Sequence, residues 1–149
     1  MVTSRRLELT AAALSVGAGL VHATVAPEHL EEWWGYGAFF IVAAAAQIAF
    51  ALVLVLEPWR RDWVPDRPPL DHARQRRWVY FAGIVGNVAI IGLYVVTRTI
   101  GIPAGPHAGV VEEVTAIGVV TKAMEFGTVI CLAQLLRMPV GDRPSAQAV

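Results

Sequence analysis

The sequence predicts an all-α fold: a membrane-embedded four-helix up-down bundle with both termini in the cytoplasm. The chain has 149 residues, of which 56% are hydrophobic and only 16% charged, and its apolar residues fall into four long runs. A soluble domain carries nearer a quarter charged residues. A run of about 20 apolar residues is the length that a helix needs to cross a bilayer. These two observations predict the membrane, and the placement of arginine predicts the orientation.

Arginine is concentrated on one side of the predicted membrane. The stub before the first run holds two, the connection between the second and third runs holds six, and the tail holds two, whereas the other two connections hold only Arg98. Basic residues are retained in the cytoplasm, so we expect both termini and the middle connection to be cytoplasmic. The net charge of zero gives no reason to expect nucleic acid as a partner. The expected partner is the lipid bilayer.

The chain forms one transmembrane domain with short connections that favour antiparallel neighbours. The first run could be read as a signal peptide, but cleavage after Ala26 would leave a proline at the new N-terminus, so we expect it to be retained. The predicted spans are residues 9–25, 36–56, 78–97 and 114–136. The basic, proline-rich residues 57–77 are expected to form the cytoplasmic loop, and residues 138–149 a disordered tail.

The connection after the first span, residues 21–34, is read as a short acidic loop at the outer face. It holds two histidines, three glutamates and two tryptophans, with no lysine or arginine. Proline suits the first position of a helix, and glutamates in the first turns are favoured by the helix dipole. We therefore expect the second helix to start at Pro27, with the tryptophans at headgroup depth.

Histidines and glutamates of the two outer connections form the first candidate site. Imidazole and carboxylate groups bind transition metals such as zinc, iron or copper, and converging helix ends could assemble three or four ligands. The spacing matches no strict ligand motif. The alternative is that the glutamates favour helix N-termini and pair with Arg98, while the histidines bond loop carbonyls. The candidate metal ligands are His22, Glu28, His29, Glu32, His107 and Glu113.

A polar layer near the middle of the membrane is the second candidate. Gln47, Asn87 and Glu125 lie near the centres of their spans, and Lys122 precedes Glu125 by three residues, on the same helix face. A charge at this depth costs several kcal/mol unless it is paired, so these side chains are expected to face the bundle interior. They could form a proton or ion relay or a substrate contact. The alternative is a Lys–Glu pair, satisfied by the two amides, that holds the helices together.

Signals for an enzyme are weak. The single cysteine, Cys131, excludes an intrachain disulfide, and no nucleophile–base pair is recognisable. The glycine-rich residues 101–109 lack the Lys-Ser/Thr ending of a phosphate loop. Haem between helices requires histidines within facing spans, and only His22 lies within one.

Three segments together resemble a known family. They are His22 with Ala26-Pro27-Glu28-His29 and Glu32-Trp33-Trp34; Gly37-Ala38-Phe39-Phe40 with Gln47; and Thr97-Arg98-Thr99-x-Gly101-x-Pro103-x-Gly105-Pro106 with Glu113 and Glu125. The chain resembles small, uncharacterised four-span membrane proteins of high-GC Gram-positive (actinobacterial) bacteria. The resemblance implies a four-span topology and brings no activity. The family often has an acidic residue ahead of the last glutamate, where this chain has Gly118 and Lys122, which disfavours a carboxylate-rich metal site.

Three functions follow as hypotheses. The first is a non-enzymatic protein of the bacterial inner membrane that binds a metal ion or a partner through the outer cluster. The second is a small proton-coupled transporter, working as a homo-oligomer, with Glu125 as the titrating group. The third is a membrane metalloenzyme or oxidoreductase at the outer face.

Overall fold

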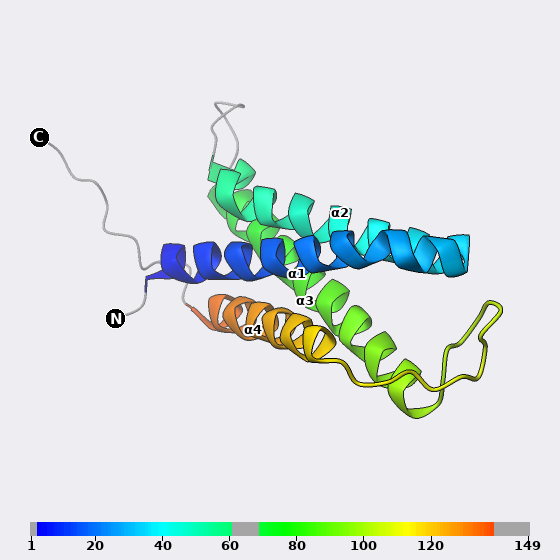
Figure 1. Cartoon of the computed structure of the whole chain (residues 1–149). Helices are drawn as coiled ribbons and strands as arrows, with labels where there is room; N and C mark the ends of the chain where they lie inside the picture. The colour runs from blue at the N-terminus through cyan, green and yellow to red at the C-terminus, as the bar shows by residue number, and fades with distance from the viewer. Residues whose placement is uncertain (1–2, 61–68, 139–149) are drawn as a thin grey trace, which may run out of the picture.

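Four long helices make up the fold. The computed structural model describes residues 3–60 and 69–138, and within these ranges it contains helices α1 (Ser4–Glu32), α2 (Trp34–Leu56), α3 (Pro69–Thr99) and α4 (Ala116–Arg137), a short 3-10 helix η1 (Pro58–Arg60) and no strand (Figure 1). All four α-helices are long and apolar enough to cross a membrane. The predicted all-α bundle is therefore confirmed. Each predicted span lies within one helix, apart from residues 114 and 115, which precede α4.

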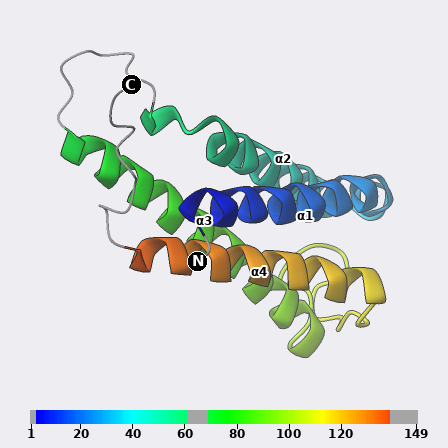
Figure 2. The same cartoon turned by 90° about the vertical axis from the view of Figure 1, so that its left-hand side faces the viewer.

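The helices alternate in direction along the chain. In both views α1 lies between α2 and α4, and α3 runs obliquely across the others (Figures 1 and 2). The principal packing pairs are α1 with α2, α1 with α4, and α3 with α4. The start of α1 and the end of α4 lie at one end of the bundle (Figure 1), which we call the terminal end. The opposite end, where α1 meets α2 and α3 leads toward α4, is called the hairpin end.

The prediction of an acidic loop after the first span is wrong. Helix α1 continues through Pro27 to Glu32, and Trp33 is the single extended residue before α2 starts at Trp34. A proline has no N–H to donate, so the Ala23 carbonyl loses its partner within the helix, but membrane helices tolerate such a proline. In the neighbouring turns the Thr24 hydroxyl donates to the Val21 carbonyl, and the His29 ring lies 2.9 Å from the Val25 carbonyl oxygen. Ala26, directly before Pro27, also offers no N-cap side chain for a new helix.

The end of the predicted cytoplasmic loop is helical, which corrects another expectation. Residues 69–77 form the first turns of α3, and Pro58–Arg60 is a 3-10 turn. Pro69 takes the first helical position, where its missing N–H costs nothing, and no proline follows it within α3. Residues 61–68 of that loop, and residues 139–149 of the predicted tail, lie outside the described residues.

The connection from α3 to α4 folds back onto the start of α2. The Tyr36 hydroxyl donates to the Ala104 carbonyl at 3.0 Å and accepts the His107 backbone N–H at 3.2 Å. Gly105 has φ +94°, and a Cβ there would lie 2.6 Å from the Tyr36 hydroxyl oxygen. Only glycine satisfies both the backbone and the space, so this loop is docked at the hairpin end.

Small residues allow the close packing of α1 on α2. The corner between them is tightest at Gly37, where a Cβ would lie 2.5 Å from the Leu30 Cβ and 2.6 Å from its Cα. Along the helices, Ala11, Ala18 and Ala51 are almost fully buried. Small residues at such contacts let two backbones approach in a membrane, where the hydrophobic effect does not drive helices together.

We expect Gly37→Ala to destabilise the protein by about 1–3 kcal/mol, because the added methyl group must displace the backbone of α1. The measurement is the thermal unfolding midpoint in one detergent. The matched control is Gly86→Ala in α3, where an added Cβ meets nothing within 4 Å. A Gly37→Ala midpoint equal to that of the control would contradict the close approach.

Candidate functional site

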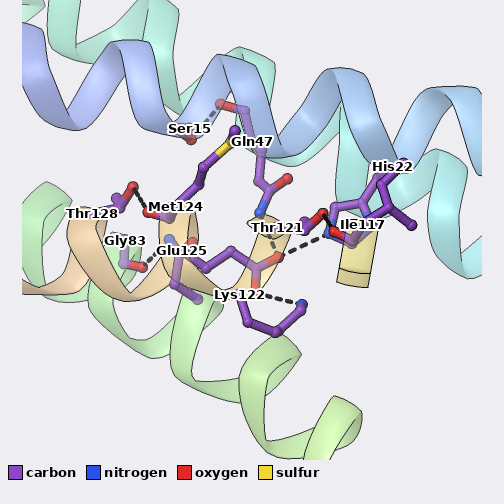
Figure 3. A network of polar contacts seen from close by, with 11 residues as sticks. Ser15, His22, Gln47, Gly83, Ile117, Thr121, Lys122, Met124, Glu125 and Thr128 are labelled. Atoms are coloured by element: carbon purple, nitrogen blue, oxygen red, sulfur yellow. Dashed lines mark hydrogen bonds and ion pairs between the residues drawn. The ribbon is translucent and has the colours of Figure 1, made fainter. Parts of the chain in front are cut away.

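The carboxylate of Glu125 is the centre of a buried polar network between α1, α2 and α4. The residue has 0% of its surface exposed. Its Oε1 lies 2.9 Å from Nε2 of His22, and its Oε2 lies 2.5 Å from Nζ of Lys122. Figure 3 shows both basic side chains pointing toward the carboxylate, His22 from α1 and Lys122 from the preceding turn of α4. We call His22, Lys122 and Glu125 the buried triad.

Helix α2 joins the network through Gln47. Its Nε2 donates to Oε1 of Glu125 at 3.3 Å, so this oxygen has one partner from α1 and one from α2. The backbone carbonyl of Gln47 accepts the Ser15 hydroxyl of α1 at 2.9 Å (Figure 3). Ser15 is 0% exposed and Gln47 4%. Polar side chains from three helices therefore meet at one level of the bundle.

The burial of the triad explains why the Glu125 carboxylate has both a counter-charge and hydrogen-bond donors. An ionised carboxylate in an apolar interior is costly unless it is paired and hydrogen-bonded. Lys122 neutralises the charge of Glu125, while His22 and Gln47 occupy Oε1. The Lys122 side chain is 16% exposed, against 5% for His22. The arrangement can hold a charge inside the bundle and offers an imidazole that can accept a further proton.

The sequence prediction placed Gln47, Asn87, Lys122 and Glu125 in one polar layer, and the structure brings three of them together. Asn87 is buried on α3, but its Nδ2 donates to the Gly83 carbonyl at 2.8 Å rather than to the carboxylate. Two amide oxygens, Oδ1 of Asn87 and Oε1 of Gln47, are buried without a hydrogen-bond partner in the described part of the chain. Such orphaned acceptors are uncommon in protein interiors.

The six predicted metal ligands do not gather. Among residues 3–60 and 69–138, no three His, Cys, Asp or Glu side chains lie close enough to hold a metal ion. His22 belongs to the buried triad instead. His29 packs against Phe40 with ring centroids 4.4 Å apart, and His107 stacks on Tyr36 at 6.3 Å. Glu28 and Glu32 lie in the last turns of α1, and Glu113 is exposed in the connection before α4.

The predicted outer ion pair of Arg98 is also not formed. The ion pairs between described residues join other groups. The Arg98 guanidinium lies 4.3 Å from the centroid of the Tyr94 ring, and its Nη1 donates to the Thr97 hydroxyl. A cation over an aromatic face is attracted by the ring quadrupole, so Tyr94 takes the place that a glutamate was expected to have.

Sequence analysis missed a second buried polar cluster, at the terminal end. Glu8 of α1 is 2% exposed and accepts the hydroxyl of Tyr80 from α3. Arg5 lies 3.7 Å from Glu8 and 2.5 Å from the carboxylate of Glu57, which follows α2. Arg5 also donates to the carbonyl of Leu54 near the end of α2. This cluster fixes the start of α1 to α2 and α3.

A spacing in α1 could have revealed both clusters. Glu8, Ser15 and His22 follow one another at intervals of seven residues, which places them on one face of a helix. All three are buried, with Ala11, Ala12 and Ala18 between them on the same face. Taken together, the polar residues of this face predict a stripe that faces the bundle interior. The prediction that His22 belongs to an outer loop separates it from this stripe.

The helices and the buried charges together indicate a class: a multi-pass helical membrane protein with an ionisable site in its interior. Comparison of the chain with protein-family models, curated proteins and solved structures finds no match. The family resemblance therefore stays a prediction.

We expect Glu125→Gln to lower the stability of the bundle by about 2–4 kcal/mol, because it leaves the Lys122 ammonium without a counter-charge. The double variant Lys122→Met/Glu125→Gln should regain most of the loss, since no unpaired charge remains. The measurement is the unfolding midpoint in detergent, treated as a double-mutant cycle. Glu113→Gln, at an exposed glutamate, is the control. Equal stability of Glu125→Gln and wild type would contradict a tightly coupled pair.

Proposed function

We propose that this protein is a proton-coupled transporter of the bacterial cytoplasmic membrane and that the buried triad is its proton-binding site. The observation that carries the proposal is a fully buried carboxylate, Glu125, held by two different basic groups from two helices. Ionisable residues inside membrane-spanning helices commonly mark ion pathways and proton relays.

The second basic group is what separates this arrangement from a structural ion pair. Lys122 alone neutralises Glu125, and a structural pair needs nothing more. Histidine is the side chain that ordinarily changes its charge near neutral pH. With His22 neutral the triad carries no net charge, and one added proton gives it a charge of +1 while the Lys122–Glu125 pair persists. The triad can therefore store and release a single proton.

The network also offers a means of coupling. His22 lies on α1, Gln47 on α2, and Glu125 on α4, so their hydrogen bonds connect helices that a transport cycle must move. A proton on the triad changes the charge and the hydrogen-bonding capacity at this junction. Such a change can shift the balance between two helix arrangements, which is what coupling requires.

The exposed apolar residues support the membrane setting of the proposal. Large apolar side chains on the outward faces of α2 and α3, including Val42, Leu52, Phe81 and Val88, are each more than half exposed. We propose that lipid covers most of this surface and that a second copy of the chain covers part of it in a homo-oligomer. The ten arginines on one side favour cytoplasmic termini.

A metal site at the outer face is less well supported, because no three potential ligands gather among the described residues. The same observation weakens the metalloenzyme hypothesis.

The test is a charge-displacement measurement on proteoliposomes fixed to a solid support. A step of the external pH should drive protons onto the triad within the membrane and give a transient current from the wild type. His22→Gln should abolish the transient, because the imidazole that takes up the proton is replaced by an amide of similar reach. Glu125→Gln should reduce it at least several-fold, because the carboxylate that stabilises the protonated imidazole is gone.

The matched control is His29→Gln, a histidine on the same helix that contacts a backbone carbonyl instead of a carboxylate. It should keep the wild-type transient. Equal transients from wild type, His22→Gln and Glu125→Gln would contradict the proposal, as would the absence of a transient from folded wild-type protein.

A further inference from the structure

A second group of charges lies at the hairpin end, where α3 ends and α4 begins. The Arg98 guanidinium is 4.3 Å from the centroid of the Tyr94 ring, and the Lys122 ammonium is 5.4 Å from the same centroid. Two cations thus share one aromatic ring between α3 and α4. We call Tyr94, Arg98 and Lys122, with the first turn of α4, the cationic corner.

Hydrogen-bond donors of the cationic corner are unsatisfied. Nε of Arg98 and the hydroxyl of Tyr94 are buried from solvent, and neither has a hydrogen-bond partner in the described part of the chain. Among residues 3–60 and 69–138, the one hydrogen bond that Arg98 donates through its side chain is from Nη1 to the Thr97 hydroxyl. Lys122 is paired with Glu125, whereas Arg98 has no ion-pair partner among the described residues.

The start of α4 adds to the positive potential. Thr115 caps the helix by accepting the Gly118 N–H, and α4 then runs for 22 residues. The N-terminus of a helix of this length favours an anion. Gly118 brings Tyr94 close to this end, since a Cβ there would lie 3.0 Å from the tyrosine hydroxyl oxygen. The Tyr94 hydroxyl thus lies beside the start of α4, and the Arg98 guanidinium lies over the ring of the same tyrosine.

The surroundings of the corner are apolar. Large apolar side chains on the two helices and their connection are at least half exposed, among them Val95, Ile100, Val114 and Ile117. A small soluble anion would gain nothing from these apolar side chains. A phospholipid fits them better, because its acyl chains cover apolar side chains while its phosphate accepts charge-assisted hydrogen bonds. Long basic side chains near the ends of membrane helices reach toward this level.

We propose that the cationic corner binds the phosphate of an anionic phospholipid headgroup. Arg98 supplies a positive charge without an ion-pair partner among the described residues and its unbonded Nε, Tyr94 donates its hydroxyl, and the start of α4 contributes its dipole. The inference does not rest on proton coupling, because Arg98 and Tyr94 make no contact with the Glu125 carboxylate. Lys122 is the one residue that belongs to both the cationic corner and the buried triad.

The test measures lipid binding to the purified full-length protein in a neutral detergent. Phosphatidylglycerol is titrated, and the bound fraction is read by native mass spectrometry. Arg98→Gln should weaken binding roughly tenfold or more, since it removes a charge-assisted interaction. Tyr94→Phe should weaken binding roughly threefold to tenfold, since it removes one neutral hydrogen bond. The control is Arg137→Gln in the last turn of α4, at the terminal end, and it should bind as wild type does.

Two comparisons decide the source of the phosphate. Uncharged diacylglycerol should bind at least tenfold more weakly than phosphatidylglycerol, and millimolar inorganic phosphate should not displace the lipid. Displacement by inorganic phosphate would overturn the proposal in favour of a free-anion site. Unchanged affinity in both Arg98→Gln and Tyr94→Phe would overturn the location, as would an equal loss in Arg137→Gln.

Discussion

The burial of the Glu125 carboxylate is the constraint on which the rest of the bundle depends. A charge at 0% exposure must be met by a counter-charge and by hydrogen-bond donors from the helices around it. Lys122 can reach it from the same helix, but His22 and Gln47 reach it only because α1 packs closely on both α2 and α4. Small residues such as Gly19, where a Cβ would lie 3.2 Å from the Ala44 carbonyl oxygen, make that approach possible.

The interior alternates between polar and apolar levels. The buried triad occupies one level, and the cluster of Arg5, Glu8 and Tyr80 occupies another at the terminal end. Between them the inner face of α1 carries alanines packed in a core with Leu54 and Leu132.

The sequence predicts those parts of the candidate site that depend on residue spacing within one helix. Lys122 and Glu125 are three residues apart on a helix, so their pairing follows from helical geometry alone. The burial of Gln47 follows from its position in an apolar run. His22 was assigned to the wrong group because Pro27 and the nearby glutamates resembled a helix start. The end of α1 determines whether the His22 imidazole faces a loop or the interior of the bundle. A proline does not determine where a membrane helix ends, and α1 continues past Pro27.

By itself, the sequence determined the four helices, their apolar character and the presence of an ion pair in the fourth, because these depend on composition and on contacts within one turn. Only the tertiary structure decided which groups complete the site. It joined His22 and Gln47 to Glu125, turned Asn87 to its own backbone, and set Arg98 against Tyr94. These outcomes depend on the rotation and crossing of whole helices, which are set by the sum of many packing contacts. The seven-residue spacing in α1 indicates that His22 faces inward, but it does not indicate which group His22 meets there.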